Sequence, residues 1–386
     1  MTPKFATLAA LLLAARCLVY ISQGLFDSSA LQRDLRTYQV AAKVFQRGAD
    51  PYNLPTLVRY SGDSSMLRYV YPPQTLWAFR ALCYVPLDNL RYGYFFLQIA
   101  ALGVLLWIWK THFLPHPYGL PLLILFAVFA FRGGLSVDLT SGNITLLNNC
   151  LLWLGFAAYL NRRYSAFAIL VLLGSLFKNV EILFLGLLLM DRRREAYQWF
   201  ALSVTCFMAY HLIGYLVYPE FYNEWLHNVS TNPEWGAYNP AALPFIEGIV
   251  FAACRLIGYH HPWGFAGYAA YLLYALALPV ISWHALRKCD LLRDRTLLLM
   301  FALFGFAILL PRFKDYSYIL LILPSAWIIL QRLPTWRYQL VAILVVLVPL
   351  FAYQPLIVAM LMFTYVMITL RREDRRGGAL RAASVS

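Results

Sequence analysis

Long apolar runs recur from one end of this sequence to the other, and they constrain the fold more than any other feature. Of its 386 residues, 61% are hydrophobic and 13% are charged, whereas soluble domains are nearer half apolar and a quarter charged. Many of the runs approach the roughly 20 apolar residues that a helix needs to cross a bilayer. The sequence therefore predicts an all-α polytopic membrane protein.

The formal net charge of +14 arises largely from basic clusters at the ends of the apolar runs. These clusters include Arg162-Arg163, Arg192-Arg193-Arg194, Arg287-Lys288 and Arg371-Arg372. Positive charge concentrates in the cytoplasmic loops of membrane proteins. We therefore interpret the charge as membrane topology and expect no nucleic-acid partner.

The apolar runs predict about 11–13 membrane segments in a single domain, residues 1–370, followed by a basic cytoplasmic tail, residues 371–386. The first segment, at about residues 5–25, has no clear cleavage signature and is interpreted as a retained helix. The two longest polar stretches, residues 26–71 and 218–245, are expected to be outer loops.

The apolar run at 165–190 is interrupted by Lys178 and Glu181. A single helix through this run would bury both charges near the bilayer centre, which is costly. Two shorter elements that meet at the outer surface avoid this cost. The sequence therefore predicts a broken helix at Lys178.

Within the first outer loop, the stretch DLRTYQVAAKVFQRGADPYN, residues 34–53, predicts an amphipathic helix that lies on the bilayer surface. Asp34, Tyr38 and Phe45 recur at helical spacing and therefore share one face. Gly48 is expected to end the helix, because glycine readily adopts the left-handed conformation of a helix C-cap.

With this topology, the unusual polar side chains gather on the outer side of the membrane. They are Asp34, Asp50, Tyr52, Asp138, Asn143, Lys178, Glu181, His227, Asn239, Arg312, Lys314 and Asp315. A carboxylate beside a substrate hydroxyl can act as a general base, and nearby cations can stabilise an anionic leaving group. Simpler explanations also fit: Asp34 as a helix N-terminal charge, Lys178 as the partner of Glu181, and Arg312 with Lys314 as interfacial cations.

Several short motifs also occur in a fixed order along the chain. They are D34-x3-Y38-x2-AA, DPY (50–52), YVYPP (69–73), SGN (141–143), KN (178–179), YNPA (238–241) and PRFKDYSY (311–318). This set resembles the GT-C glycosyltransferases of family GT87, which are polyprenol-phosphate-mannose-dependent α-mannosyltransferases. The resemblance covers essentially the whole chain.

The resemblance implies a GT-C fold and a glycosyltransferase that moves a sugar, mannose in this family, from a polyprenyl-phosphate donor to an extracytoplasmic glycan or glycolipid. Asp34 occupies the position of the catalytic base, and a single base suits an inverting displacement. Lys178, Arg312 and Lys314 would contact the donor phosphate. The substrate pocket would contain Tyr38, Asp50, Tyr52, Tyr71, Asn143, His227, Asn239 and Asp315.

The resemblance further implies a multi-pass protein of the inner or plasma membrane, with its active site on the extracytoplasmic face. No metal and no cofactor are expected, because the sequence has no acidic DxD cluster and cations can stabilise a lipid phosphate. A transporter or flippase, or a polymerase of polyprenyl-linked glycans, is the alternative. Transporters usually place ionisable groups at mid-bilayer and contain inverted repeats, whereas the charges here cluster on the outer face.

Overall fold

The computed structural model describes residues 11–12, 14–16, 18–19, 32–231, 236–259, 264–287 and 294–383, and these residues form helices and loops without strands. Most of the predicted first helix, residues 5–25, lies outside the described residues. The chain groups into two compact units: Met1–Pro115 with Leu135–Pro233, and His116–Gly134 with Glu234–Ser386. The single membrane domain stays a prediction.

Five described helices are long and apolar enough to cross a membrane: Leu87–Phe113, Gly119–Ser141, Arg194–Val217, Phe265–Leu286 and Gln354–Arg372. Six shorter apolar helices accompany them: Thr145–Leu160, Tyr164–Ser175, Asn179–Met190, Arg295–Leu309, Asp315–Gln331 and Trp336–Leu347. In lipid, a helix satisfies its backbone hydrogen bonds internally. The predicted all-α polytopic class is therefore confirmed.

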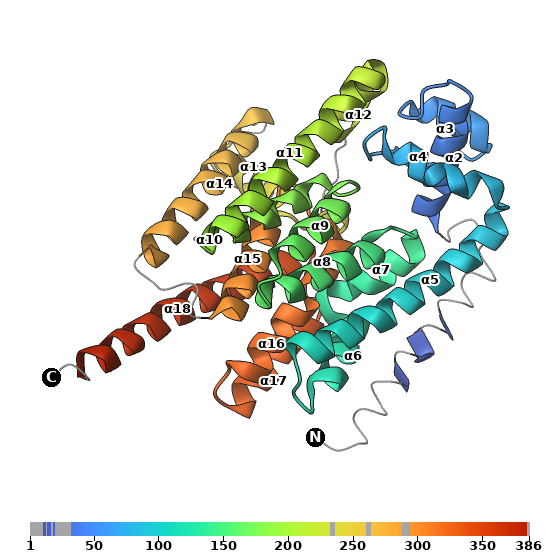
Figure 1. Cartoon of the computed structure of the whole chain (residues 1–386). Coiled ribbons are helices and arrows are strands. Elements are labelled where there is room, and N and C mark those ends of the chain that lie inside the picture. Colours follow the sequence, from blue (N-terminus) through green and yellow to red (C-terminus); the bar gives the residue numbers. More distant parts are fainter. Residues whose placement is uncertain are drawn as a thin grey trace. The chain divides into compact units, whose positions relative to one another are not determined.

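The first unit begins with short elements, part of which lie in the stretch predicted as the first outer loop, and one long helix (Figure 1). They are α2 (Arg33–Gln46), α3 (Leu54–Ser61), α4 (Thr75–Phe79), η1 (Arg80–Tyr84), α5 (Leu87–Ile108) and the π-helical turn η2 (Trp109–Phe113). The predicted helix is confirmed as α2, and its place on the bilayer surface stays a prediction. Its end also follows the prediction, because Gly48 adopts φ +71° and its N–H donates to the carbonyl of Phe45 at 3.0 Å.

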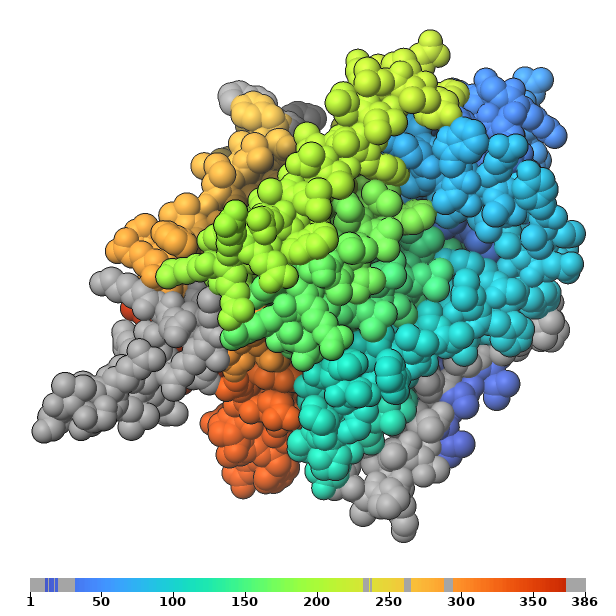
Figure 2. All heavy atoms as spheres, viewed as in Figure 1, coloured from blue at the N-terminus to red at the C-terminus, as the bar shows by residue number. Residues whose placement is uncertain are grey.

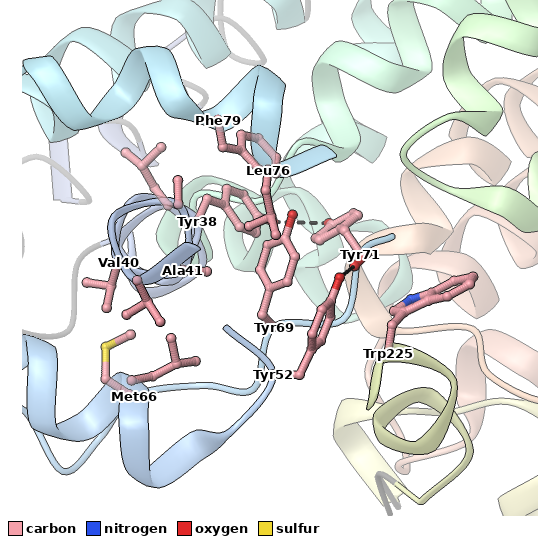
Figure 3. Packing of buried hydrophobic residues seen from close by; sticks show 14 of the residues in the cluster. Tyr38, Val40, Ala41, Tyr52, Met66, Tyr69, Tyr71, Leu76, Phe79 and Trp225 are labelled. Carbon is pink, nitrogen blue, oxygen red and sulfur yellow. Dashed lines mark hydrogen bonds between the residues drawn. The ribbon is translucent and has the colours of Figure 1, made fainter. Parts of the chain in front are cut away.

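An aromatic cluster forms the core beneath α2 (Figure 3). Tyr38 is 3% exposed and stacks on Phe79, with ring centroids 4.6 Å apart. Ala41 and Ala42 are fully buried, so the small residues of this face let α2 pack closely on the unit. Full burial of a side chain such as Phe79 contributes about 1.5–3 kcal/mol. The predicted apolar face of α2 is therefore the face that packs inward.

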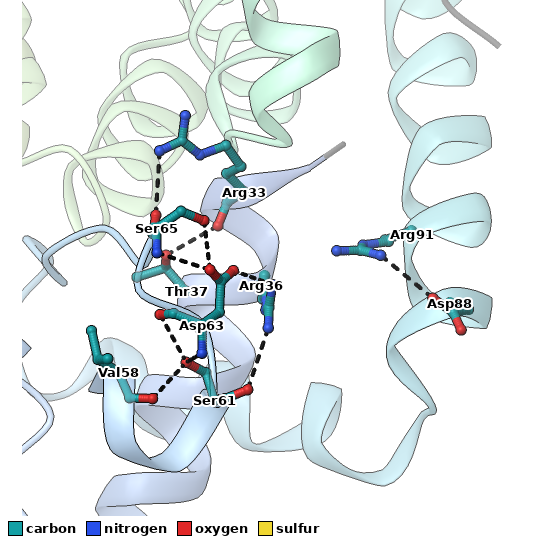
Figure 4. Close-up of polar contacts among 9 residues, drawn as sticks. All are labelled: Arg33, Arg36, Thr37, Val58, Ser61, Asp63, Ser65, Asp88 and Arg91. Carbon is teal, nitrogen blue, oxygen red and sulfur yellow. Dashed lines mark hydrogen bonds and ion pairs between the residues drawn. The ribbon is translucent and has the colours of Figure 1, made fainter. Parts of the chain in front are cut away.

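On the other side of α2, a polar clamp holds the loop after α3 (Figure 4). Asp63 forms an ion pair with Arg36 of α2, and its Oδ1 accepts hydrogen bonds from the backbone and hydroxyl of Ser65, both at 2.8 Å. The guanidinium of Arg33 donates to the carbonyl of Ser65 at 3.3 Å. Arg33 and Arg36, near the start of α2, therefore hold this loop.

The remainder of the first unit is a helical bundle that includes one 3₁₀ helix, η4, and one short α-helix, α10. Its elements are α7 (Gly134–Ser141), α8 (Thr145–Leu160), α9 (Tyr164–Ser175), η4 (Asn179–Leu185), α10 (Gly186–Met190), α11 (Arg194–Val217) and α12 (Pro219–Thr231). Lys178 lies at φ −113° and ψ 83°, outside the helical region. The predicted break at Lys178 is therefore confirmed.

Helix α11 lies at the surface of its unit, in yellow-green in Figure 2, and exposes apolar side chains along its length. Leu202, Leu212 and Leu216 are all more than half exposed. An exposed apolar surface of this kind suits contact with lipid. On the opposite side, α11 packs against α9.

Helix α12 lies within the predicted second outer loop, residues 218–245, and was not predicted as a helix. Trp225 donates from Nε1 to the carbonyl of Val70 at 3.0 Å. Asn228 donates from Nδ2 to the carbonyl of Tyr52 at 2.7 Å. Helix α12 therefore binds the backbone of the stretch predicted as the first outer loop at two points.

The second unit consists of packed helices. Its elements are α6 (Gly119–Phe129), η3 (Ala130–Gly133), η5 (Gly236–Tyr238), α13 (Ala242–Leu256), α14 (Gly264–Leu286), α15 (Arg295–Leu309), η6 (Asp315–Leu321), α16 (Ile322–Gln331), α17 (Trp336–Leu347) and α18 (Gln354–Ala383). Helix α6 packs on α16, α13 on α14, and α15 on α18. The backbone of α18 continues into the basic segment at 371–386.

Candidate functional site

Asp34 lies in the first turn of α2 and is held by the side chain of Asn143. The Nδ2 atom of Asn143 donates to Oδ2 of Asp34 at 2.6 Å. Asn143 belongs to the turn between α7 and α8, and its main-chain carbonyl accepts from Tyr94 at 3.0 Å and from Gln98 at 3.2 Å. Both donors come from α5, so this helix fixes the turn that carries the partner of Asp34.

Lys178 reaches the same group of side chains from the broken helix. Its Nζ atom donates to Oγ1 of Thr145 at 2.6 Å. The Thr145 hydroxyl in turn donates to Oδ1 of Asn143 at 2.8 Å. A chain of three hydrogen bonds therefore joins Lys178 to Asp34, and it brings three of the predicted site residues together.

The start of α2 is placed by the residue before it. Gln32 is fully buried, and its N–H donates to the carbonyl of Thr140 in α7 at 2.7 Å. Its side-chain Nε2 donates to Gln98 at 2.9 Å and to the carbonyl of Leu139 at 3.3 Å. Helices α5 and α7 therefore hold the backbone immediately ahead of Asp34.

Two predicted pocket residues, Tyr38 and Tyr71, form a buried hydroxyl pair with their oxygens 3.0 Å apart. Burial raises the pKa of both phenols well above its ordinary value, and the charge of Asp34 raises the pKa of each further. Tyr71 is also within hydrogen-bonding reach of the Asn143 side chain. Both hydroxyls therefore stay protonated at physiological pH, and one of the two donates to the other.

Two buried acids flank Lys178. Asp138 accepts the backbone N–H of Leu146 at 3.2 Å, at the start of α8. Glu181 accepts a hydrogen bond from Asn148. Both carboxyl groups interact electrostatically with Lys178, and the simpler explanation of Lys178 as the partner of Glu181 stays a prediction.

Other predicted residues of the first unit contribute to the structure of its loops. Asp50 accepts the N–H of Tyr52 at 2.8 Å and thereby closes the turn after α2. Tyr52 is 2% exposed and donates to the carbonyl of Tyr71 at 2.7 Å. His227 lies on the exposed side of α12, whereas its neighbour Asn228 is buried.

The remaining predicted residues, Asn239, Arg312, Lys314 and Asp315, gather in the second unit. Oδ1 of Asn239 accepts the N–H of Phe313 at 2.9 Å, which ties this residue to the segment between α15 and η6. The ammonium of Lys314 lies over the ring of Tyr316, 5.7 Å from its centroid. Arg312 and Asp315 are half-buried in the same segment.

Sequence reasoning did not single out Thr145, Tyr94, Gln98 or Gln32. Each is a polar side chain near or within an apolar helix. Each forms a hydrogen bond with a residue at least 33 positions away along the chain. Thr145 also bonds to the nearby Asn143. The available signal was weak: buried polar side chains in a membrane helix require partners. Among the described residues, no three His, Cys, Asp or Glu side chains gather closely enough to hold a metal ion.

Comparison with known families gives one match. The model of glycosyltransferase family 87 matches residues 69–311. No curated protein matches the chain. The matched region contains Asn143 and Lys178, and helix α2 precedes it; the hydrogen bond from Asn143 links Asp34 to this region.

Proposed function

Because this chain belongs to glycosyltransferase family 87, we propose that it transfers mannose from a polyprenyl-phosphate donor to an extracytoplasmic glycan or glycolipid. The enzyme is an inverting transferase of the GT-C type and works without a metal ion or cofactor. It lies in the inner or plasma membrane, with its active site on the extracytoplasmic face. Family membership favours transfer over the flippase and polymerase alternatives.

The observation that carries this proposal is the hydrogen-bond chain from Lys178 to Asp34. It holds a carboxylate at one end and an ammonium group at the other, and the transfer reaction needs both charges. Asp34 takes the proton of the acceptor hydroxyl as the acceptor oxygen attacks C1 of the sugar. The bond between C1 and the phosphate oxygen breaks in the same step. A single displacement of this kind inverts the configuration at C1.

The cations stabilise the leaving lipid phosphate. Lys178, at the end of the hydrogen-bond chain, is the proposed phosphate contact, and Arg312 and Lys314 are proposed as further contacts from the sequence alone. Positive groups aimed at developing negative charge are among the largest sources of catalysis in enzymes. A phosphate monoester of a polyprenol can therefore leave without a bound metal.

The proposed substrate pocket contains Tyr38, Asp50, Tyr52, Tyr71, Asn143, His227, Asn239 and Asp315. Tyr38 and Tyr71 have the strongest support, because their hydroxyls meet each other and interact with Asp34. Aromatic rings with a polar tip suit a ligand that has both apolar and polar faces, as a sugar does.

The test compares Asp34→Asn with the wild-type protein. The full-length proteins are placed in liposomes with polyprenyl phosphate that carries radiolabelled mannose, and membranes from a strain that lacks the gene supply the acceptor. We expect Asp34→Asn to lower transfer by about a hundredfold or more, which is the usual contribution of a general base. Asp88→Asn is the matched control, because the Asp88 side chain is 82% exposed.

Each part of the proposal has its own contrary result. Equal transfer by Asp34→Asn would overturn the role of Asp34 as base. Transfer from polyprenyl phosphoglucose or phosphoarabinose, but not from the mannose donor, would overturn the choice of sugar. Activity that EDTA removes and Mg²⁺ or Mn²⁺ restores would overturn the metal-free mechanism.

A further inference from the structure

Thr145 lies at the centre of the hydrogen-bond chain between Lys178 and Asp34. We propose that it is a positioning residue, which fixes the orientation of the Asn143 amide and thereby holds the Asp34 carboxylate in its ionised form. This inference rests on the proposed function of Asp34 as the base. It adds a residue whose hydroxyl acts on the reaction through another side chain.

The donor and acceptor capacities of these groups determine the direction of the chain. An ammonium group can only donate, so the Thr145 oxygen accepts from Lys178 at 2.6 Å. The hydroxyl has one hydrogen, which it donates to Oδ1 of Asn143 at 2.8 Å. The Nδ2 side of the amide then faces Asp34.

The other end of the chain requires the same orientation. An ionised carboxylate accepts hydrogen bonds and cannot donate them. If the Asn143 amide were turned over, its oxygen would face the oxygen of Asp34 at the 2.6 Å distance that Nδ2 now occupies. Thr145 therefore keeps the amide in the orientation that stabilises the charge on Asp34.

The surroundings prevent Thr145 and Asn143 from finding other arrangements easily. They are 2% and 3% exposed. The carbonyl of Thr145 accepts from Asn149 at 2.9 Å, and the carbonyl of Asn143 accepts from Tyr94 and Gln98. Because water does not reach these groups readily, a lost hydrogen bond leaves a buried polar atom unsatisfied.

Other ionisable groups also act on Asp34 and must be separated from the effect of Thr145. Tyr38 of α2, Tyr71 of the outer loop, Tyr94 of α5 and Asp138 of α7 interact with it electrostatically. The three tyrosines are neutral at physiological pH. Asp138 is also within hydrogen-bonding reach of the Thr145 hydroxyl and competes with Asn143 for its one hydrogen, so it needs a variant of its own.

The central experiment measures kcat/KM as a function of pH for Thr145→Val and Thr145→Ser. Purified full-length protein in detergent is assayed with polyprenyl phosphomannose as donor and octyl α-mannoside as the acceptor probe. Without the hydroxyl, Asp34 loses support for its charge, so its pKa rises. The acid limb is the part of the pH profile in which kcat/KM falls as Asp34 is protonated. In Thr145→Val we expect it to move up by about one pH unit, and we expect kcat to fall by about tenfold.

Two variants serve as controls. Thr145→Ser keeps the hydroxyl and is expected to restore the wild-type acid limb. Thr140→Val is the matched control, since the hydroxyl of Thr140 bonds to carbonyls of its own helix and its loss should leave the profile unchanged. Thermal unfolding in detergent verifies that each variant is folded.

Thr145 could act on Asp34 through Asn143 or through Asp138, and the direction in which Asp138→Asn moves the acid limb distinguishes the two. Removal of a nearby negative charge lowers the pKa of a carboxyl group or leaves it unchanged. The acid limb should therefore stay in place or move down, opposite to Thr145→Val. An upward shift in Asp138→Asn would mean that Thr145 acts through Asp138, and the inference would be wrong.

Two further results would overturn it. One is a folded Thr145→Val that keeps the wild-type acid limb and kcat. The other is a Thr145→Ser that has the same defect as Thr145→Val, because the effect would then come from the methyl group of Thr145. Failure of the proposed function is distinguishable from either, because Asp34→Asn would then retain transfer in the same assay.

Discussion

Gly142 and Gln32 lie so close together that no side chain fits at position 142. An ideal Cβ at Gly142 would lie 2.9 Å from both the Cβ and the Oε1 of Gln32. Gly142 also adopts φ +70°, a conformation that residues with a side chain rarely take. This contact presses the turn that carries Asn143 against the backbone immediately before α2, and it helps to place Asp34.

Gly142→Ala is therefore expected to displace the turn and reduce sugar transfer by about tenfold or more, because a displacement near 1 Å at a reacting group can cost this much. The measurement is kcat with the polyprenyl phosphomannose donor. Gly48→Ala is a matched control: Gly48 has φ +71°, but its Cβ would meet nothing within 4 Å. Both variants bear a similar backbone strain of about 1 kcal/mol. Similar activity of the two variants would contradict this account.

Lys178→Met is expected to raise the KM for the donor about ten- to hundredfold, since it removes a charged hydrogen-bond donor from the proposed phosphate site. It also removes the cation that interacts with Glu181 and Asp138. The double variant Lys178→Met, Glu181→Gln should therefore recover thermal stability but not donor affinity. If the double variant also recovers donor affinity, Lys178 serves as the structural partner of Glu181.

The alkaline side of the pH–rate profile should not depend on the tyrosine pair. Burial and the charge of Asp34 raise the pKa of Tyr38 and Tyr71 above its ordinary value near 10, so both stay protonated through neutral and mildly alkaline pH. Tyr71→Phe should lower kcat by about two- to tenfold through its lost hydrogen bonds and leave the alkaline limb in place. Tyr60→Phe, on an exposed ring, is the control. An alkaline limb that moves in Tyr71→Phe would refute the prediction.

The clamp at Asp63 should weaken in acid. Hydrogen bonds from Ser65 lower the pKa of Asp63 from its ordinary value, and Arg36 lowers it further. A carboxyl group with a lowered pKa in the folded state stabilises that state above the unfolded pKa, near 3.9, and loses this effect as pH falls through the folded pKa. Asp63→Asn should therefore increase hydrogen exchange of the loop at residues 61–66 at pH 7, and the difference from wild type should shrink in acid and vanish at a pH below the folded pKa of Asp63.

Asp88→Asn provides the comparison for this experiment. Asp88 pairs with Arg91 at 3.4 Å, and its side chain is 82% exposed (Figure 4). Exposed pairs of this kind contribute little. Exchange near residue 88 should therefore stay the same at both pH values. A similar response of the two variants would show that the clamp at Asp63 has no special effect.

Much of the fold could be predicted because its signals are local. Helix α2 follows from the spacing of Asp34, Tyr38 and Phe45 and from the glycine that ends it. The break at Lys178 follows from a charge inside an apolar run. Helix α12 was missed because its polar residues led the stretch to be interpreted as a loop, although Phe221, Tyr222, Trp225 and Val229 recur at helical spacing and three of these residues pack on the aromatic core.

The candidate site was less accessible from the sequence, because its contacts join distant segments. Asp34 and Asn143 are 109 positions apart, and Lys178 and Thr145 are 33 apart. Acids and bases attract notice in an apolar sequence, whereas a threonine at a helix start does not. Thr145 acquires its importance only from the two partners that the fold brings to its hydroxyl.

Helix α12 holds the first outer loop through main-chain carbonyl oxygens, those of Val70 and Tyr52. Every residue type has such an oxygen, so this attachment does not depend on the identity of the side chains that the loop carries at these two positions. The side chains at positions 52 and 70 can therefore change without the loss of an acceptor for these two hydrogen bonds. The two hydrogen bonds to α12 and the side chains at these two positions can thus vary independently.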